Sequence, residues 1–292
     1  MRVRSNGVDI EVESFGDPAA PPVLLVMGLT MQMVAWDEAF CALLVDRGYR
    51  VLRFDNRDIG LSSRLSHLGV PRIAPLLPKS ALGMRIRVPY TVADMAQDAL
   101  GVLDALDLPG AHIVGASMGG MIAQRCAIAA PERVLSLTSI MSTTGSRRLP
   151  LPNPRALSML LKRPPREPAA REAFAVEVYT ALQGGTAVDV DRLRARHRIS
   201  FARASDTEGG VRQFAAVLAE GDRTKALRQL TMPVAVAHGR QDPLVRPAAG
   251  HATAAAIPDA ELLLLDQMGH GLPPRVWAPL ADLIDRTARR AP

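Results

Sequence analysis

Cysteine is scarce in this chain, which has only Cys41 and Cys126 among 292 residues. Two cysteines cannot build a disulfide framework and supply too few sulfur ligands for a metal site, so we expect neither, and no cofactor. Aromatic residues make up only 4% of the chain, although 48% of it is hydrophobic. Aliphatic and methionine side chains therefore have to fill the core, and they suffice for one large domain with an inserted lobe.

Long apolar runs are also missing, because none approaches the roughly 20 residues of a membrane span. The first residues, 1–7, lack the apolar stretch of a signal peptide, so we expect a cytoplasmic protein with no membrane partner. Lysine occurs only at positions 79, 162 and 225, and arginine supplies most of the net charge of +6. No motif of a nucleic-acid module accompanies this charge, so we interpret it as compositional bias and expect no nucleic-acid partner.

The order of apolar segments predicts an α/β fold. Residues 8–13 alternate after Asn6-Gly7, which is typical of an antiparallel hairpin, and residues 23–27 form the uninterrupted apolar run of a strand buried on both faces. Strands and helices then alternate, with strands expected at 50–55, 111–114, 134–140, 233–238 and 261–265, and helices at 34–46, 92–106, 118–129, 247–256 and from 274. A mostly parallel sheet with helices on both faces follows, with active groups at the carboxyl ends of its strands.

Residues 142–230 break this rhythm. Prolines punctuate the start of the segment, and helical, arginine-rich stretches follow without a buried-strand pattern. We therefore predict a helical cap or lid at 142–230, inserted into a core domain made of residues 1–141 and 231–292.

The segment around Ser117 predicts a nucleophile. Strand residues 111–114 lead into Gly115-Ala116-Ser117-Met118-Gly119, and a helical segment follows, which is the required context of the G-x-S-x-G elbow. The glycines relieve clashes around a serine held in a strained backbone conformation. The alternative is a glycine-rich turn in which Ser117 only caps the helix.

A serine hydroxyl needs a base to take its proton and a carboxylate to orient that base. In chains with this elbow, the acid and then the histidine follow the serine. Asp242 and His270 each fall in a loop after a late strand, so we predict them as acid and base. His238 is the rival base, with a structural hydrogen bond as its simpler role, and Asp266 is the fallback acid.

Backbone N–H groups are expected to stabilise the oxyanion. The loop after residues 23–27 should supply the Leu29 N–H, and the start of the helix after Ser117 should supply the Met118 N–H. Methionines cluster in or beside the loops around the expected site, which suits an adaptable apolar pocket or ordinary core filling. The substrate-binding residues that we predict are Gly28, Met31, Met141 and Met268.

Three segments, 27–29, 54–62 and 115–120, resemble the α/β-hydrolase superfamily and are closest to bacterial carboxylesterases of the aclacinomycin methylesterase-like group. The resemblance implies an eight-stranded sheet, a helical cap and hydrolysis through an acyl-enzyme. It also implies that the charged turn at 55–58 is structural. One departure is Met27, where many members of the superfamily carry histidine before the glycine.

These features predict a serine carboxylesterase acting on small to medium apolar esters, with a small-molecule ester as partner. The same triad serves perhydrolases, lactonases and thioesterases, and a slow-turnover ligand-binding receptor could also retain it. The run Arg192, Arg194, Arg196 and Arg198 could attract anionic substrates, although such runs are more often solvated helix faces. The sequence does not indicate an oligomeric state.

Overall fold

A computed structural model describes residues 1–162, 164–165, 167–205 and 207–291. Its centre is an eight-stranded sheet in the order β1-β2-β4-β3-β5-β6-β7-β8. The pairs β1–β2 and β2–β4 are antiparallel, and all other neighbouring strands are parallel. The strands are β1 (Arg2–Ser5), β2 (Val8–Phe15), β3 (Pro22–Val26), β4 (Arg50–Phe54), β5 (Ala111–Ala116), β6 (Val134–Ile140), β7 (Val234–Gly239) and β8 (Glu261–Leu265). The predicted α/β-hydrolase fold with a mostly parallel sheet is confirmed.

The apolar run that predicted a buried strand is β3, which lies between β4 and β5. Successive side chains of β3 point to opposite faces of the sheet. Leu24 and Val26 join one core cluster, while Val23 and Leu25 join the other, and all four are fully buried. An uninterrupted apolar run is what this central position requires, because helices cover both faces.

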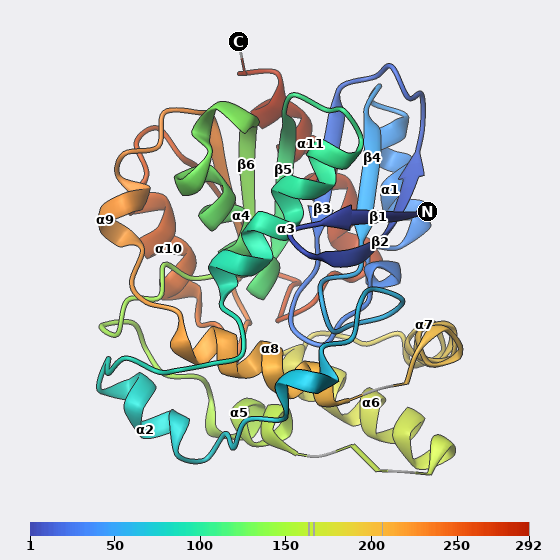
Figure 1. The fold of residues 1–292 in the computed structure, drawn as a ribbon, viewed down its shortest axis with the longest axis vertical. Helices are drawn as coiled ribbons and strands as arrows, with labels where there is room; N and C mark the ends of the chain where they lie inside the picture. The colour runs from blue at the N-terminus through green and yellow to red at the C-terminus, as the bar shows by residue number, and fades with distance from the viewer. Residues whose placement is uncertain (163, 166, 206, 292) are drawn as a thin grey trace.

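Helices cover both faces of the sheet (Figure 1). The cluster on one face includes residues of α3 (Val92–Ala105), α4 (Met118–Ala129) and α10 (Pro247–Ala256). The cluster on the other face includes residues of α1 (Glu38–Val45) and α11 (Trp277–Ala288). Short 3₁₀ helices η1 (Met33–Ala35), η2 (Ser66–Leu68), η3 (Pro131–Arg133) and η4 (Pro274–Val276) lie in the connections.

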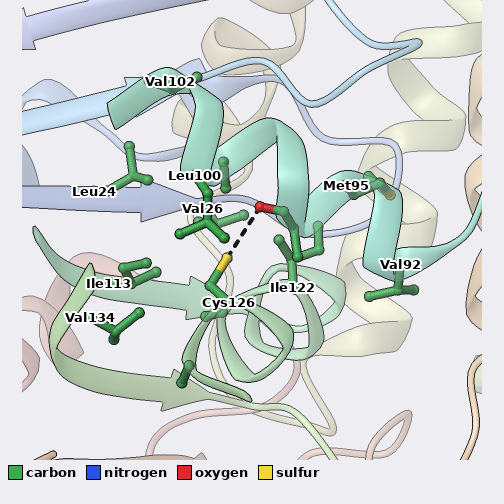
Figure 2. Packing of buried hydrophobic residues seen from close by; sticks show 14 of the residues in the cluster. Leu24, Val26, Val92, Met95, Leu100, Val102, Ile113, Ile122, Cys126 and Val134 are labelled. Atoms are coloured by element: carbon green, nitrogen blue, oxygen red, sulfur yellow. Dashed lines mark hydrogen bonds between the residues drawn. The ribbon is translucent and has the colours of Figure 1, made fainter. Parts of the chain in front are cut away.

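The two cysteines act as small buried groups. Cys41 lies in α1 and Cys126 in α4, and neither has exposed surface. The Cys126 thiol donates to the Ala96 carbonyl oxygen of α3 at 3.5 Å, within the apolar contact that joins α3 and α4 (Figure 2). Burial raises the pKa of both thiols to about 12, which keeps them protonated and unreactive.

Between β6 and β7 the described residues form helices and no strand: α5 (Pro154–Leu161), α6 (Pro168–Leu182), α7 (Val190–Arg203), α8 (Glu208–Ala219) and α9 (Thr224–Leu227). Helices α5 to α8 gather at one end of the sheet, together with α2 (Leu76–Ala81), which the sequence analysis did not anticipate (Figure 1). The described helices include none that is both long and apolar enough to cross a membrane. The division into a core and a cap at 142–230 stays a prediction.

Candidate active site

Ser117 stands at the sharp turn between β5 and α4. Its backbone has φ +57° and ψ −118°, a conformation that side-chain-bearing residues rarely adopt. Such strain costs about 1–3 kcal/mol and persists only where the surroundings enforce it. Here the Ser117 N–H donates to the Ile140 carbonyl oxygen of β6 at 2.9 Å, and the Ser142 hydroxyl donates to the Ser117 carbonyl oxygen at 2.8 Å.

The two outer glycines of the motif allow backbone to approach backbone around this turn. A Cβ on Gly115 would lie 2.1 Å from the Gly119 carbonyl oxygen, and a Cβ on Gly119 would lie 2.1 Å from the Val26 carbonyl oxygen. Both distances are far inside van der Waals contact, and neither backbone oxygen can rotate away. The motif therefore packs the elbow against the end of β3, where the loop with Gly28 and Leu29 begins.

The structure brings Ser117, His270 and Asp242 into one hydrogen-bonded line. His270 Nε2 lies 2.9 Å from Ser117 Oγ, and His270 Nδ1 lies 2.7 Å from Asp242 Oδ2. The three residues follow the carboxyl ends of β5, β8 and β7, so parallel strands place them at one edge of the sheet. This arrangement can move a proton from a serine hydroxyl to an imidazole held in one orientation.

Asp242 is almost completely buried, at 2% exposure, and its carboxylate is fully hydrogen-bonded. The other oxygen, Oδ1, accepts the N–H groups of Leu244 at 2.9 Å and Val245 at 2.8 Å. Burial by itself would raise the pKa of Asp242, but the charge of His270 and hydrogen bonds from His238 and His270 outweigh it and hold the pKa below its ordinary value. Asp242 is thus kept ionised beside the imidazole.

The two alternatives to this acid and base have other partners. His238 Nε2 lies 2.7 Å from the Val245 carbonyl oxygen and 3.5 Å from Asp242 Oδ2. His238 therefore contacts the loop that carries Asp242. Asp266 is largely exposed and forms an ion pair with Arg240 at 2.7 Å. Neither residue has a hydrogen bond to Ser117 among the contacts of the described residues.

The loop after β3, which carries the predicted oxyanion donor Leu29, lies beside the serine. Gly28 lies against Ser117, because a Cβ on Gly28 would be 3.1 Å from Ser117 Cβ. Neither the Leu29 N–H nor the Met118 N–H donates to a backbone oxygen within the described residues, so both remain available to a substrate. Thr30, the next residue, has φ +63°, and its N–H donates to Gln213 Oε1 of α8 at 3.0 Å.

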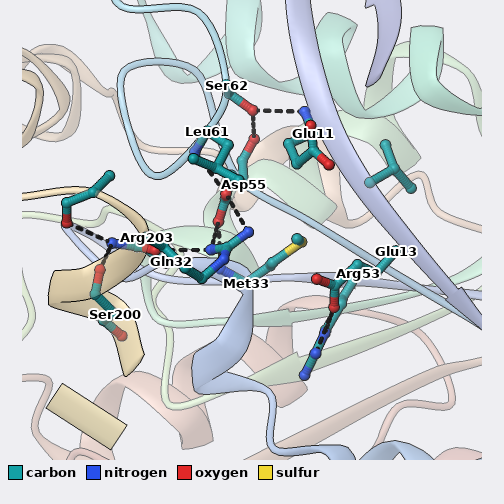
Figure 3. A network of polar contacts seen from close by, with 12 residues as sticks. Glu11, Glu13, Gln32, Met33, Arg53, Asp55, Leu61, Ser62, Ser200 and Arg203 are labelled. Carbon is teal, nitrogen blue, oxygen red and sulfur yellow. Dashed lines mark hydrogen bonds and ion pairs between the residues drawn. The ribbon is translucent and has the colours of Figure 1, made fainter. Parts of the chain in front are cut away.

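A buried polar network fixes the far end of this loop (Figure 3). Asp55 Oδ1 accepts the Met33 N–H at 2.7 Å, and Arg203 of α7 pairs with Asp55 Oδ2 at 3.0 Å. Gln32 donates to the Ser200 carbonyl oxygen at 2.7 Å and accepts from Arg203 at 2.8 Å. The charged turn therefore joins the loop to α7, which is a structural task.

The rest of that turn is equally committed to structure. Arg57 binds Asp98 through two contacts of 2.6 Å, and Asp58 binds Arg212 of α8 through two contacts of 2.8 Å. The Asp58 and Arg212 side chains have no exposed surface. The described residues contain no group of three or more His, Cys, Asp or Glu side chains arranged to hold a metal ion.

A family model described as the alpha/beta hydrolase fold matches residues 21–273. The chain belongs to the alpha/beta hydrolase fold family. It is 31% identical to rhodomycin D methylesterase from Streptomyces peucetius, in an alignment that covers 99% of this chain and 98% of that protein. The predicted resemblance and the carboxylic ester hydrolase class are therefore confirmed.

Other relatives of this hydrolase show how widely the fold is used. A 2-hydroxy-6-oxononadienedioate/2-hydroxy-6-oxononatrienedioate hydrolase from Cupriavidus pinatubonensis is 32% identical over 78% of this chain and 72% of that protein. The solved structure of an esterase from Exiguobacterium antarcticum matches with a TM-score of 0.72 at 18% identity and covers 99% of both chains. At that identity the structural match shows the fold alone.

The predicted substrate-binding residues do not share one location. Gly28 borders Ser117, and Met31 is half-buried against the core cluster. Met141 is 5% exposed, and Met268 has no exposed surface. Met268 packs among core side chains, and its role as a substrate-binding residue stays a prediction, like that of the other three.

Sequence reasoning missed two side chains that hold the oxyanion loop of this hydrolase. Gln213 binds the Thr30 N–H, and Asn56 donates to the Met27 carbonyl oxygen at 2.9 Å. Asn56 lies within a turn that the sequence analysis had already quoted. Gln213 lies 183 positions from Thr30, and no local pattern links the two.

Proposed function

We propose that this hydrolase cleaves carboxylic esters through a triad of Ser117, His270 and Asp242. The observation that carries the proposal is the continuous line of contacts, 2.9 Å from serine to imidazole and 2.7 Å from imidazole to carboxylate. These are hydrogen-bonding distances for a nucleophile and its general base. The strained elbow supports the same role, because strain of this kind concentrates at functional sites.

In the first half of the reaction, His270 Nε2 takes the Ser117 proton while Oγ attacks the ester carbonyl carbon. The N–H groups of Leu29 and Met118 bind the resulting oxyanion, and the positive end of α4 adds to the stabilisation. Collapse of the tetrahedral intermediate breaks the bond to the leaving alcohol, which receives the proton from His270. An acyl group then remains on Ser117.

In the second half, His270 removes a proton from water as the water oxygen attacks the acyl carbon. The second tetrahedral intermediate collapses, the acid leaves, and Ser117 Oγ regains a proton from His270. Asp242 stays ionised throughout and stabilises the imidazolium. The N–H bonds from Leu244 and Val245 keep the Asp242 carboxylate turned toward His270.

The substrate that we propose is a small to medium apolar ester with a small alcohol as leaving group. The full-length relatives are named methylesterases, which supports a methyl ester. Helices α5 to α8 lie over the end of the sheet that carries Ser117, and we propose that residues 142–230 form the cap over this substrate. Met31 and Gly28 stay in the proposed pocket, and Met141 is retained at its wall.

The proposed mechanism can be tested by comparing the rates at which the wild type and Ser117→Ala hydrolyse p-nitrophenyl butyrate. We expect the wild type to turn over at about 1 s⁻¹ or faster, and the variant to lose roughly 10⁴ to 10⁶ of that rate. Ser66→Ala, at an exposed serine, is the matched control and should keep the wild-type rate. Near-normal turnover by Ser117→Ala would refute the assignment.

A second screen settles the substrate class. Methyl esters of increasing acyl length, a lactone and a thioester should be compared at equal concentration. The proposal requires the highest kcat/KM on an ester, with activity on butyrate or hexanoate. A higher kcat/KM on the lactone or the thioester would change the proposed substrate class and leave the proposed triad in place. Stoichiometric binding without turnover would indicate a receptor.

A further inference from the structure

A second cavity lies beside the triad without including Ser117 or His270. Its volume is about 600 Å³, within the range of small-molecule sites. One wall comes from the start of α5 and the end of α6, and the other from the loop that joins β7 to α10. We call it the cap–core cleft, and the lining residues that matter here are Asn153, Arg155, Thr180, Arg240 and Arg246.

Three arginines line the cap–core cleft. Arg155 belongs to the α5 wall, while Arg240 and Arg246 belong to the opposite wall. Within the described part of the chain, neither Arg155 nor Arg246 has a side-chain hydrogen bond or ion pair. Arg240 pairs only with Asp266, whose side chain is 82% exposed, and an exposed pair of this kind holds its arginine weakly.

Among the described residues of the walls, the one charged acceptor is already used and the charged groups left over are donors, although the neutral Gln241 Oε1 also has no hydrogen-bond donor. Asn153 Oδ1 accepts the Arg155 N–H at 2.9 Å, which leaves the Asn153 amide nitrogen available. Asp242 is the one carboxylate among the described lining residues, and its two oxygens are bound by His270, Leu244 and Val245. A cavity whose spare charged groups are guanidinium groups suits a ligand rich in anionic oxygens.

The arginines of α7, which the sequence analysis considered for anion attraction, do not offer the same opportunity. Arg192 forms an ion pair with Asp37, and Arg198 binds Glu172 through contacts of 2.7 and 3.0 Å. Arg196 lies over the Tyr179 ring at 5.1 Å. Their charge is neutralised or stacked locally, unlike that of Arg155 and Arg246 in the cleft.

We propose that the cap–core cleft binds a small molecule carrying two or more carboxylate or phosphate groups, at a site separate from the ester substrate of Ser117. Two anionic groups are needed to engage arginines on both walls, and the volume exceeds what a single carboxylate fills. Guanidinium groups bind both carboxylate and phosphate oxygens, so the proposed class of ligand includes molecules with either group. The bound molecule would connect α5 to the loop that carries Asp242.

Isothermal titration of the full chain with citrate and, separately, with pyrophosphate tests this site. We expect saturable binding of at least one probe at a Kd below about 1 mM. Arg155→Ala/Arg246→Ala should weaken that binding at least tenfold. Arg85→Ala/Arg228→Ala is the matched control, because it removes the same charge from exposed arginines outside the cleft and should leave Kd within twofold. Ionic strength is held constant with NaCl, which screens general attraction.

Ser117→Ala distinguishes this site from the catalytic one, because it should bind the probe with wild-type affinity while losing hydrolysis. Citrate binding alone would assign a polycarboxylate, pyrophosphate binding alone a phosphorylated ligand, and either supports the proposal. Three results would overturn it: no saturable binding of either probe, equal weakening in both arginine double variants, or binding that disappears in Ser117→Ala. Unliganded melting curves of both double variants verify that each is folded.

Discussion

Gln213 offers the sharpest test of how the oxyanion loop is held. Its side chain has no exposed surface, Oε1 accepts the Thr30 N–H at 3.0 Å, and Nε2 donates to the Arg57 carbonyl oxygen at 2.9 Å. Gln213→Leu keeps a similar volume and removes both hydrogen bonds. The Thr30 N–H then lacks its acceptor one residue after Leu29, whose N–H is the proposed oxyanion donor.

The size of the effect follows from these two bonds. Each is worth about 1 kcal/mol net, and an orphaned buried group adds about 1–3 kcal/mol, so the free energy of unfolding should fall by roughly 3–5 kcal/mol. Losing an oxyanion donor completely costs about 3 kcal/mol in the barrier, and a displaced donor costs less. We therefore expect kcat to fall about 10- to 100-fold. KM should change by less than about threefold, because the donor acts mainly on the transition state.

Steady-state kinetics on p-nitrophenyl butyrate, measured well below the melting temperature, separate kcat from KM. Thr287→Val is the control, because the buried Thr287 hydroxyl donates to Leu283 at 2.7 Å within α11, and its loss should reduce stability with kcat unchanged. Gln213→Glu should be intermediate, since a carboxylate can accept from Thr30 but cannot donate to the Arg57 carbonyl oxygen. If Gln213→Leu kept the kcat of Thr287→Val, the proposed positioning role would be wrong.

Three further predictions follow from single positions. Asp242→Asn should lower kcat about 10⁴-fold with little change in KM, because a neutral amide does not stabilise the imidazolium. A loss of less than tenfold in stopped-flow or steady-state assays would contradict this prediction. Burial lowers the pKa of His112 from 6.5 to about 4, so as pH falls the unfolded chain binds a proton on this imidazole before the folded chain does. The free energy of unfolding should therefore decline by about 3 kcal/mol as pH falls from 6.5 to 4. Denaturant melts of His112→Gln should show a weaker dependence of stability on pH in that window. Gly119→Ala should prevent formation of the elbow and leave little soluble active protein, whereas Gly221→Ala, with open space around its Cα, should express and melt like the wild type.

Features with a local cause were predictable from the sequence. The bounds expected for α4, β6, α10 and β8 agree with the structure. The spacing of apolar residues and the positions of proline and glycine indicate these bounds in the sequence itself. The G-x-S-x-G elbow is equally local, because its glycines avoid steric clashes with residues close to them in the sequence. The same signals led to Asp242 and His270, because strand ends can be located before the fold is known.

Features that depend on distant packing were not predictable. The bond between Gln213 and the Thr30 N–H and the buried pair of Arg212 and Asp58 join parts of the chain more than 150 residues apart. The burial of Met268 also depends on packing, because a methionine beside such a loop can turn into the core or toward the substrate. Its sequence neighbours do not indicate which.

The backbone contacts between the helical segment and the catalytic loops limit how freely parts of this protein could be exchanged. The His270 N–H donates to the Leu182 carbonyl oxygen at the end of α6, and the Asn153 N–H donates to the Pro243 carbonyl oxygen, each at 2.7 Å. A chimera with a helical segment from another hydrolase would need to reproduce both main-chain contacts before its new side chains could matter. The proposed cap is therefore coupled through main-chain bonds to the loops that carry Asp242 and His270, and directed evolution of the cap has to preserve both bonds.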